Sequence, residues 1–329
     1  MWNWAAHPVT WLSFLGMLIG AVVILLLTLV VVMYSIYWQR KLIGWLQLRI
    51  GPNRVGPFGL LQSAADVFKL LIKEDVVPRK VDRVLFLIAP IIAFVPAFMA
   101  LSVVPFSRTH VFTANIAIGA LFYIAMSTIS IHGVMLGGWA SNNKYALIGG
   151  MRSAAQMLSF EIPIGLSVVG VVLMNGSINL NDIVNAQAHS GWWNIVPQIL
   201  AAIVFLVAST GELNRTPFDL PEAESELVGG YHTEYSGFRF AFFMLTEYVY
   251  LFAMAGLFAT LFLGGWSGPF LPGWLWFAIK AFLFISVQFW IQATFPRMRV
   301  DKVMPFAWKV LMPLALANLV ITAVLRAVL

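Results

Sequence analysis

Acidic residues gather in one short segment of a chain that is otherwise apolar. Residues 211–237 hold six of the 14 Asp and Glu residues, and long apolar runs that read as membrane spans lie on both sides of them. Carboxylates kept at a membrane face are costly to desolvate and usually serve proton or ion chemistry. The six acids are Glu212, Asp219, Glu222, Glu224, Glu226 and Glu234.

Three of these acids occupy every second position. In an extended segment Glu222, Glu224 and Glu226 would share one face, whereas in a helix they would fan out. Pro217 and Pro221 argue against a helix in the first part of the segment. Because neighbouring negative charges favour protonation, such a cluster can load and release protons near neutral pH. The alternative is a solvated acidic loop, against which the interleaved apolar and aromatic residues argue.

Further charged residues lie inside the apolar runs. Glu161, Glu247 and Lys280 would each cost at least about 2.5 kcal/mol at the centre of a lone membrane helix, so we expect them to face protein or water. We interpret Glu161 and Glu247 as sites of proton chemistry, with a buried ion pair or an interfacial position as the alternative. We expect Lys280 to reach the opposite membrane surface with its long side chain.

The elements that must position these carboxylates are membrane helices. Hydrophobic residues make up 60% of the chain and charged residues 10%, with a mean hydropathy of +0.87; soluble domains carry about 25% charged residues. The apolar runs are long and do not alternate, which favours helices over a barrel. We predict an all-α, polytopic membrane protein with one membrane domain, 1–329. Its eight transmembrane helices are expected at about residues 11–38, 84–106, 111–139, 156–175, 192–210, 238–264, 273–295 and 306–328.

Basic residues predict how the chain is oriented. Most of the 20 Lys and Arg residues lie in or beside the loops after the first, third, fifth and seventh predicted spans. Loops rich in Lys and Arg stay on the cytoplasmic side, so both termini are expected on the periplasmic side. The net charge of +6 reflects this bias and needs no nucleic-acid partner. We expect a multi-pass protein of the bacterial inner (plasma) membrane, with the mitochondrial inner membrane as the alternative.

The chain contains no cysteine. Disulfides, iron–sulfur ligation and thiol catalysis by this chain are therefore excluded. Of the five histidines only His132 lies inside a predicted span, which argues against a haem held by two histidines between helices. We expect no metal site and no redox centre in this chain.

The first cytoplasmic loop contains a surface helix. Gly51, Pro52 and Asn53 break helical structure. In the segment Gly59–Lys73 that follows, apolar and polar residues fall on two faces of a helix, which we expect to lie along the membrane surface. Three interpretations stay open: an interfacial anchor, a helix at the mouth of a cavity that lipid can reach, or a basic surface for an anionic partner or lipid headgroups.

Several motifs carry a resemblance that covers nearly the whole chain. The most specific motifs span residues 51–57 (GPNRVGP), 138–147 (GWASNNKYAL), 152–156 (RSAAQ), 214–227 (NRTPFDLPEAESEL) and 293–297 (ATFPR). In these motifs the chain resembles one family of membrane subunits of respiratory complex I, the proton-translocating NADH:quinone oxidoreductase. Its members are known as the H subunit in bacteria and as NADH dehydrogenase subunit 1 in mitochondria.

The resemblance implies a role at the junction between the hydrophilic and membrane arms of the complex. There the subunit forms the lipid-facing entrance and the tunnel for quinone, the substrate, and couples quinone reduction to proton translocation. The chain is then one subunit of an enzyme, a translocase. Its partners are the other subunits of the complex and membrane lipid, and FMN and iron–sulfur clusters are expected in those partner subunits.

The resemblance also assigns roles to individual residues. A funnel of carboxylates is implied for proton and charge coupling, at Glu161, Glu212, Glu222, Glu224, Glu226 and Glu247. Quinone contacts are expected from Arg40, Arg54, Asp66, Phe218, Asp219, Tyr231 and Arg297.

Two positions depart from the family pattern. The family usually has Glu where this chain has Gln39, and Arg where it has Gln292, so a proton role at position 39 and a charge partner at position 292 are in doubt. Two other functions are weighed. A related membrane-bound hydrogenase, or a complex with another electron donor, generally diverges in the acidic motif that is complete here. A stand-alone transporter usually shows an internal repeat, and we find none.

Overall fold

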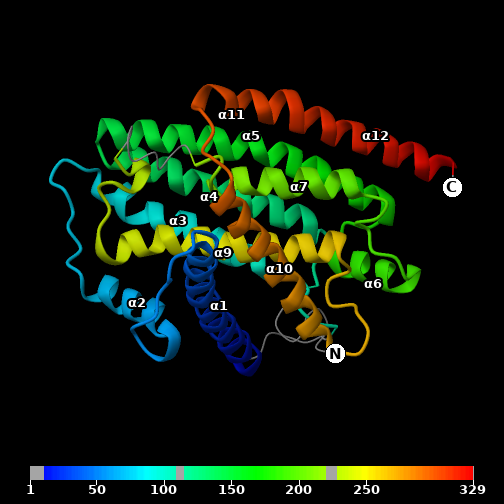
Figure 1. The fold of residues 1–329 in the computed structure, drawn as a ribbon, viewed down its shortest axis with the longest axis horizontal. Coiled ribbons are helices and arrows are strands. Elements are labelled where there is room, and N and C mark those ends of the chain that lie inside the picture. The colour runs from blue at the N-terminus through cyan, green and yellow to red at the C-terminus, as the bar shows by residue number, and fades with distance from the viewer. Residues whose placement is uncertain (1–10, 109–114, 220–227, 329) are drawn as a thin grey trace.

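The computed structural model describes residues 11–108, 115–219 and 228–328. Helices joined by loops make up these ranges, and they contain no strand, so the all-α prediction is confirmed (Figure 1). The predicted acids Glu222, Glu224 and Glu226 lie outside the described residues.

Seven helices in the described ranges are long and apolar enough to cross a membrane, which confirms the polytopic membrane fold. The last of them is one continuous helix whose middle turn is π-helical. The seven are α1 (Trp11–Leu46), α3 (Arg83–Leu101), α4 (Gly119–Ala140), α5 (Lys144–Asn175), α9 (Gly237–Phe262), α10 (Gly273–Thr294) and the run of α11 (Val300–Phe306), η3 (Ala307–Leu311) and α12 (Met312–Val328).

The fifth predicted span corresponds to a shorter apolar helix, α7 (Ile199–Glu212), of 14 residues. Residues 194–198 form turns, and the first two of them bond to the end of α9. Asn194 Nδ2 donates to the carbonyl of Leu261, and the backbone N–H of Ile195 donates to that of Phe262, both at 2.9 Å. At about 1.5 Å per residue, α7 alone is shorter than the hydrocarbon core.

Three other elements refine the predicted boundaries. The amphipathic surface helix appears as α2 (Gln62–Ile72), after the short 3-10 helix η1 (Pro57–Gly59). The helix α5 starts well before the predicted residue 156, because the side chain of Asn143 accepts a hydrogen bond from the backbone of Tyr145 and caps it. Two further elements were not predicted, α6 (Leu180–Ser190) and the 3-10 helix η2 (Gly230–His232).

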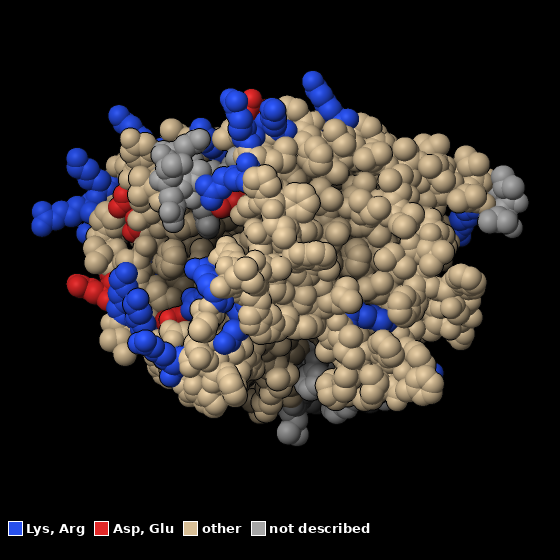
Figure 2. Space-filling model, in the orientation of Figure 1, with Lys and Arg blue, Asp and Glu red and all other residues tan. Residues whose placement is uncertain are grey.

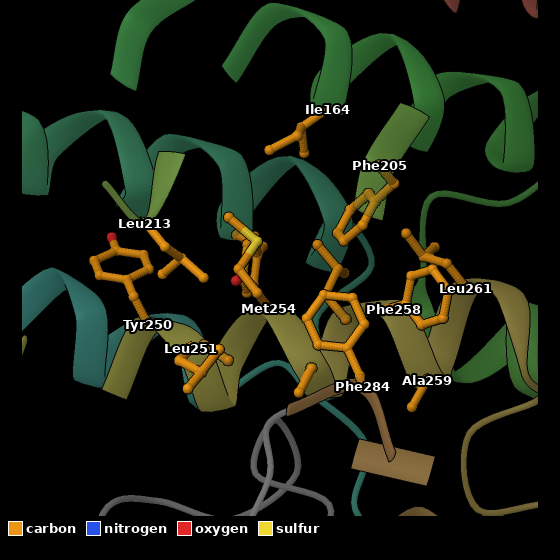
Figure 3. Close-up of a cluster of buried hydrophobic side chains, with 14 of the residues drawn as sticks. Ile164, Phe205, Leu213, Tyr250, Leu251, Met254, Phe258, Ala259, Leu261 and Phe284 are labelled. Carbon is orange, nitrogen blue, oxygen red and sulfur yellow. The ribbon is translucent and has the colours of Figure 1, made fainter. Parts of the chain in front are cut away.

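The core lies where α9 packs mainly against α3 and α10, and also contacts α7. Phe258 of α9 contacts Phe205 of α7 and Phe284 of α10, with ring centroids 5.8 and 4.8 Å apart. Figure 3 shows these rings together with Ile164 and Met254 in one apolar cluster. Such packing fixes the helices against one another and leaves the polar groups described below in defined positions.

Charged residues concentrate at one end of the helices. Figure 2 shows Lys and Arg gathered at the end of the molecule where Figure 1 places α2, the start of α5 and the start of α9. This distribution fits the charge bias used to predict orientation. We call this end of the molecule the α2 end.

Candidate functional site

Glu161 is buried on α5 and is bound by two hydroxyl groups of α4. Only 9% of Glu161 is exposed. Ser127 Oγ donates to its Oε1 at 3.0 Å, and Thr128 Oγ1 donates to the same oxygen. Hydrogen bonds from hydroxyls stabilise a carboxylate that has lost contact with bulk water. The side chain is therefore held in one orientation between two helices.

Glu212 ends α7 and is buried as well, with Oε2 lacking a hydrogen-bond partner among the described residues. It lies within electrostatic range of Glu161. Gln156 fixes the backbone around Glu212, since its Nε2 donates to the carbonyls of Gly211 and Phe218, each at 2.7 Å. A buried carboxylate oxygen without a partner is costly in a structural role, and it marks Glu212 as a candidate for proton exchange.

A small cavity lies beside Glu212 and Glu247. Its volume is about 40 Å³, and Tyr231, Thr246 and Tyr250 are among the residues that line it. That volume accommodates a water molecule, which needs about 10–15 Å³ and polar partners. Two carboxylates from different helices thus line one water-sized space.

Arg215 is the cation of this site. Its Nη2 lies 3.0 Å from Glu247 Oε1, and its Nε and Nη1 have no hydrogen-bond acceptor within the described part of the chain. The guanidinium instead lies over the rings of Tyr248 and Phe289, 4.9 and 5.0 Å from their centroids. The two rings add attraction to a cation that is shielded from water.

A second ion pair joins Asp219, the last described residue before the acidic run, to the loop after α10. Arg297 Nη2 lies 2.6 Å from Asp219 Oδ2, and the backbone N–H of Met298 donates to Pro217 at 2.9 Å. Phe218 between them packs on Phe160 and is buried in the core. Asp219 also lies within electrostatic range of Glu247, so a charge on Asp219 affects the Glu247 carboxyl group at the cavity.

The first loop forms two further hollows at the α2 end. Arg40 pairs with Asp66 of α2 at 2.5 Å, and Gln62 Nε2 donates to the same carboxylate at 3.2 Å. A cavity of about 440 Å³, the α1 cavity, is lined by Gln39, Arg40, Ile43, residues 49–52 and Tyr248. A second hollow of about 350 Å³ lies between Asp66, Lys69 and Tyr235.

Two titratable groups of the loop before α9 are perturbed by burial. Burial lowers the pKa of His232 to about 4, and its Nδ1 has no hydrogen-bond partner among the described residues. Burial also raises the pKa of Tyr235, against the opposing effect of Arg239. The Tyr235 ring stacks on Phe86 with centroids 4.0 Å apart. Both side chains are therefore neutral at neutral pH and pack as part of the fold.

A family profile described as NADH dehydrogenase matches residues 19–323. The chain belongs to the NADH dehydrogenase family. It is 59% identical to the H subunit of NADH-quinone oxidoreductase from Brevibacillus brevis, over 96% of this chain and 94% of that protein. The proteins of the same name from Bacillus cytotoxicus and Bacillus thuringiensis are each 56% identical, over 96% and 97% of this chain and 96% of their own length. The family resemblance drawn from the motifs is confirmed.

For this NADH dehydrogenase family member, the structure brings some predicted site residues together and separates others. Glu212, Glu247 and Tyr231 line the small cavity, and Glu161 lies within electrostatic range of Glu212. Arg40 and Asp66 instead line the hollows of the first loop, and Arg54 is exposed outside them. In the described ranges no group of three or more His, Asp or Glu residues is arranged to hold a metal ion.

Several residues of the site were missing from the predicted set. Arg215, which pairs with Glu247, is one of them. The sequence could have indicated it, because Arg215 is the one Lys or Arg residue in the acidic segment 211–237. The hydroxyls of Ser127 and Thr128 and the amide of Gln156 gave no signal, since isolated polar residues are common in membrane helices.

Proposed function

We propose that this chain is the quinone-chamber and energy-coupling membrane subunit of a proton-translocating NADH:quinone oxidoreductase. Relatives at 56–59% identity over nearly the full length are named as the H subunit of NADH-quinone oxidoreductase. The observation that carries the proposal is the pair of carboxylates, Glu212 and Glu247, that lines one water-sized cavity with Glu161 in electrostatic range.

The chemistry follows from the reaction of a quinone. Reduction to the quinol takes up two electrons and two protons, so the quinone site becomes more negative before the protons arrive. Glu161, Glu212 and Glu247 respond to this charge by taking up or passing on protons, because buried carboxylates are sensitive to a nearby charge. Electrons arrive through FMN and iron–sulfur clusters in partner subunits, and Arg215 limits how much negative charge the cavity holds.

Quinone approaches from the membrane along the first loop. The apolar and basic lining of the α1 cavity suits a headgroup followed by an isoprenoid tail, with contacts from Arg40, Asp66 and the loops that carry Asp219 and Arg297. The complex lies in the bacterial plasma membrane, with both termini of this chain on the periplasmic side.

The test uses the assembled complex in sealed membrane vesicles. Glu161→Gln and Glu212→Gln should each lower quinone-linked NADH oxidation, or the proton gradient formed per NADH, by about tenfold or more. Glu74→Gln, at an exposed carboxylate, serves as the matched control and should change neither. Full rates and full gradients in both buried-site variants would rule out the coupling role.

A further inference from the structure

Gln39 and Gln292 form a hydrogen-bonded pair between α1 and α10. Gln39 Nε2 donates to Gln292 Oε1 at 2.9 Å. The hydroxyl of Tyr248, on α9, donates to Oε1 of the same Gln39. One amide group therefore connects three helices, at the α2 end of the molecule.

The arrangement depends on the chemistry of an amide. An amide donates and accepts at once, so Gln39 can bind a phenol and a second amide together. A carboxylate at this position could accept from Tyr248 and from the Gln292 amide N–H, but it would bring a negative charge close to Tyr248. The link is thus uncharged and directional.

Tyr248 extends the link to the candidate site. Its ring lies under the Arg215 guanidinium at 4.9 Å, and Arg215 lies 3.0 Å from Glu247. Gln39 and Tyr248 also form part of the wall of the α1 cavity. The same phenol therefore contacts both that cavity and the ion pair.

We infer that Gln39 and Gln292 act as one uncharged positioning unit, which holds Tyr248 and, through it, the Arg215–Glu247 pair. The two glutamines are then a single feature, because the hydrogen bond between them needs both side chains. This inference rests on the proposed function, since the position of the ion pair matters only if Glu247 responds to quinone chemistry.

The test is a double-mutant cycle in the whole complex. Gln39→Ala and Gln292→Ala should each lower kcat for quinone-linked NADH oxidation by about three- to tenfold, the effect of one neutral hydrogen bond. Because both break the same link, the double variant should be no slower than the slower single variant. NADH oxidation with a water-soluble acceptor should stay normal and reports assembly. Gln47→Ala, at an exposed amide just beyond α1, is the matched control.

Two further variants separate positioning from simple packing. Tyr248→Phe keeps the ring under Arg215 but loses the hydroxyl, so it should reproduce Gln39→Ala and make Gln292→Ala silent. Gln39→Glu adds an ionisable group to the wall of the α1 cavity, so it should change the pH dependence of kcat, and adding Gln292→Arg should restore the parent's profile by pairing the new charge.

Independent, multiplicative losses in Gln39→Ala and Gln292→Ala would overturn the inference, as would an unchanged rate and pH profile in all the variants. The proposed function fails separately. If Glu247→Gln keeps the full rate and gradient, the coupling role of the ion pair is wrong. If Glu247→Gln is impaired while the two glutamines act independently, only the positioning unit is wrong.

Discussion

The Arg215 guanidinium lies 3.0 Å from the Glu247 carboxylate, and only 2% of the Arg215 side chain is exposed. Removing the cation leaves a carboxylate in a site that is largely closed to water. We expect Arg215→Met to destabilise the subunit by about 3 kcal/mol, the lower end for buried pairs, because 24% of the Glu247 side chain is exposed. Thermal inactivation of the detergent-solubilised complex measures this loss.

The control for Arg215 is an ion pair on the surface. Arg299 and Asp301 are 81% and 61% exposed, so Arg299→Met should change stability by no more than about 0.5 kcal/mol. Equal inactivation temperatures for Arg215→Met and Arg299→Met would show that the buried Arg215 pair contributes no more to stability than the exposed pair.

The effect of the α4 hydroxyls on the quinone-linked rate should depend on Glu161, since their other bonds are to the Ile124 carbonyl of their own helix. The double variant Ser127→Ala, Thr128→Val removes both hydroxyl donors to Glu161, so the carboxyl group loses the bonds that hold its orientation. We expect a several-fold lower quinone-linked rate. In a Glu161→Gln background the same two substitutions should add little. Thr294→Val, at an exposed hydroxyl bonded within its own helix, is the control. An equal loss in both backgrounds would argue that the hydroxyls act elsewhere.

His232 should make the subunit less stable in acid. Its pKa is about 4 in the folded chain and 6.5 when unperturbed. Between these values the unfolded chain binds the proton and the folded chain does not, so stability is complete above pH 6.5 and falls as the pH drops toward 4. The loss from this group reaches about 3 kcal/mol. Inactivation temperatures measured across this range should show a shallower acid loss for His232→Gln than for exposed His189→Gln. Identical profiles would exclude His232 as the cause.

Close helix packing predicts opposite outcomes for two glycines. A Cβ at Gly133 of α4 would lie 2.3 Å from the backbone nitrogen of Ala93 on α3, whereas one at Gly165 of α5 would meet nothing within 4 Å. Gly133→Ala should therefore cost about 1–3 kcal/mol by forcing the helices apart. Gly165→Ala should be neutral or stabilising, since alanine favours helix by about 1 kcal/mol. Thermal inactivation of the solubilised complex measures both effects. A Gly133→Ala variant as stable as the parent would contradict this packing.

The sequence predicted the helices well wherever hydropathy alone defines them. α9 and α10 lie within two residues of the predicted spans 238–264 and 273–295. The start of α5 was missed because Lys144 and Arg152 interrupt the apolar pattern, although both lie in the helix. The start of α7 was missed because an apolar run cannot reveal that Asn194 bonds to Leu261 on another helix.

The candidate site could be predicted in composition but not in connectivity. The acids Glu161, Glu212 and Glu247 stand out because charge is rare in a membrane chain. Their partners depend on contacts between residues far apart in sequence, such as Thr128 with Glu161 or Gln39 with Gln292. Phe218, predicted to contact quinone, is buried in the core. The sequence could not distinguish these two positions, because an aromatic side chain suits both.

The length of α7, 14 residues, also determines where Glu212 lies along the helix axis. The turn that precedes the helix bonds to the end of α9, and Glu212 lies at the other end of the helix, so the helix length sets the distance between them. Inserting a single residue would advance Glu212 by about 1.5 Å and turn it by about 100° around the helix axis. A substitution along this helix therefore leaves Glu212 in place, whereas an insertion or a deletion moves it away from the cavity.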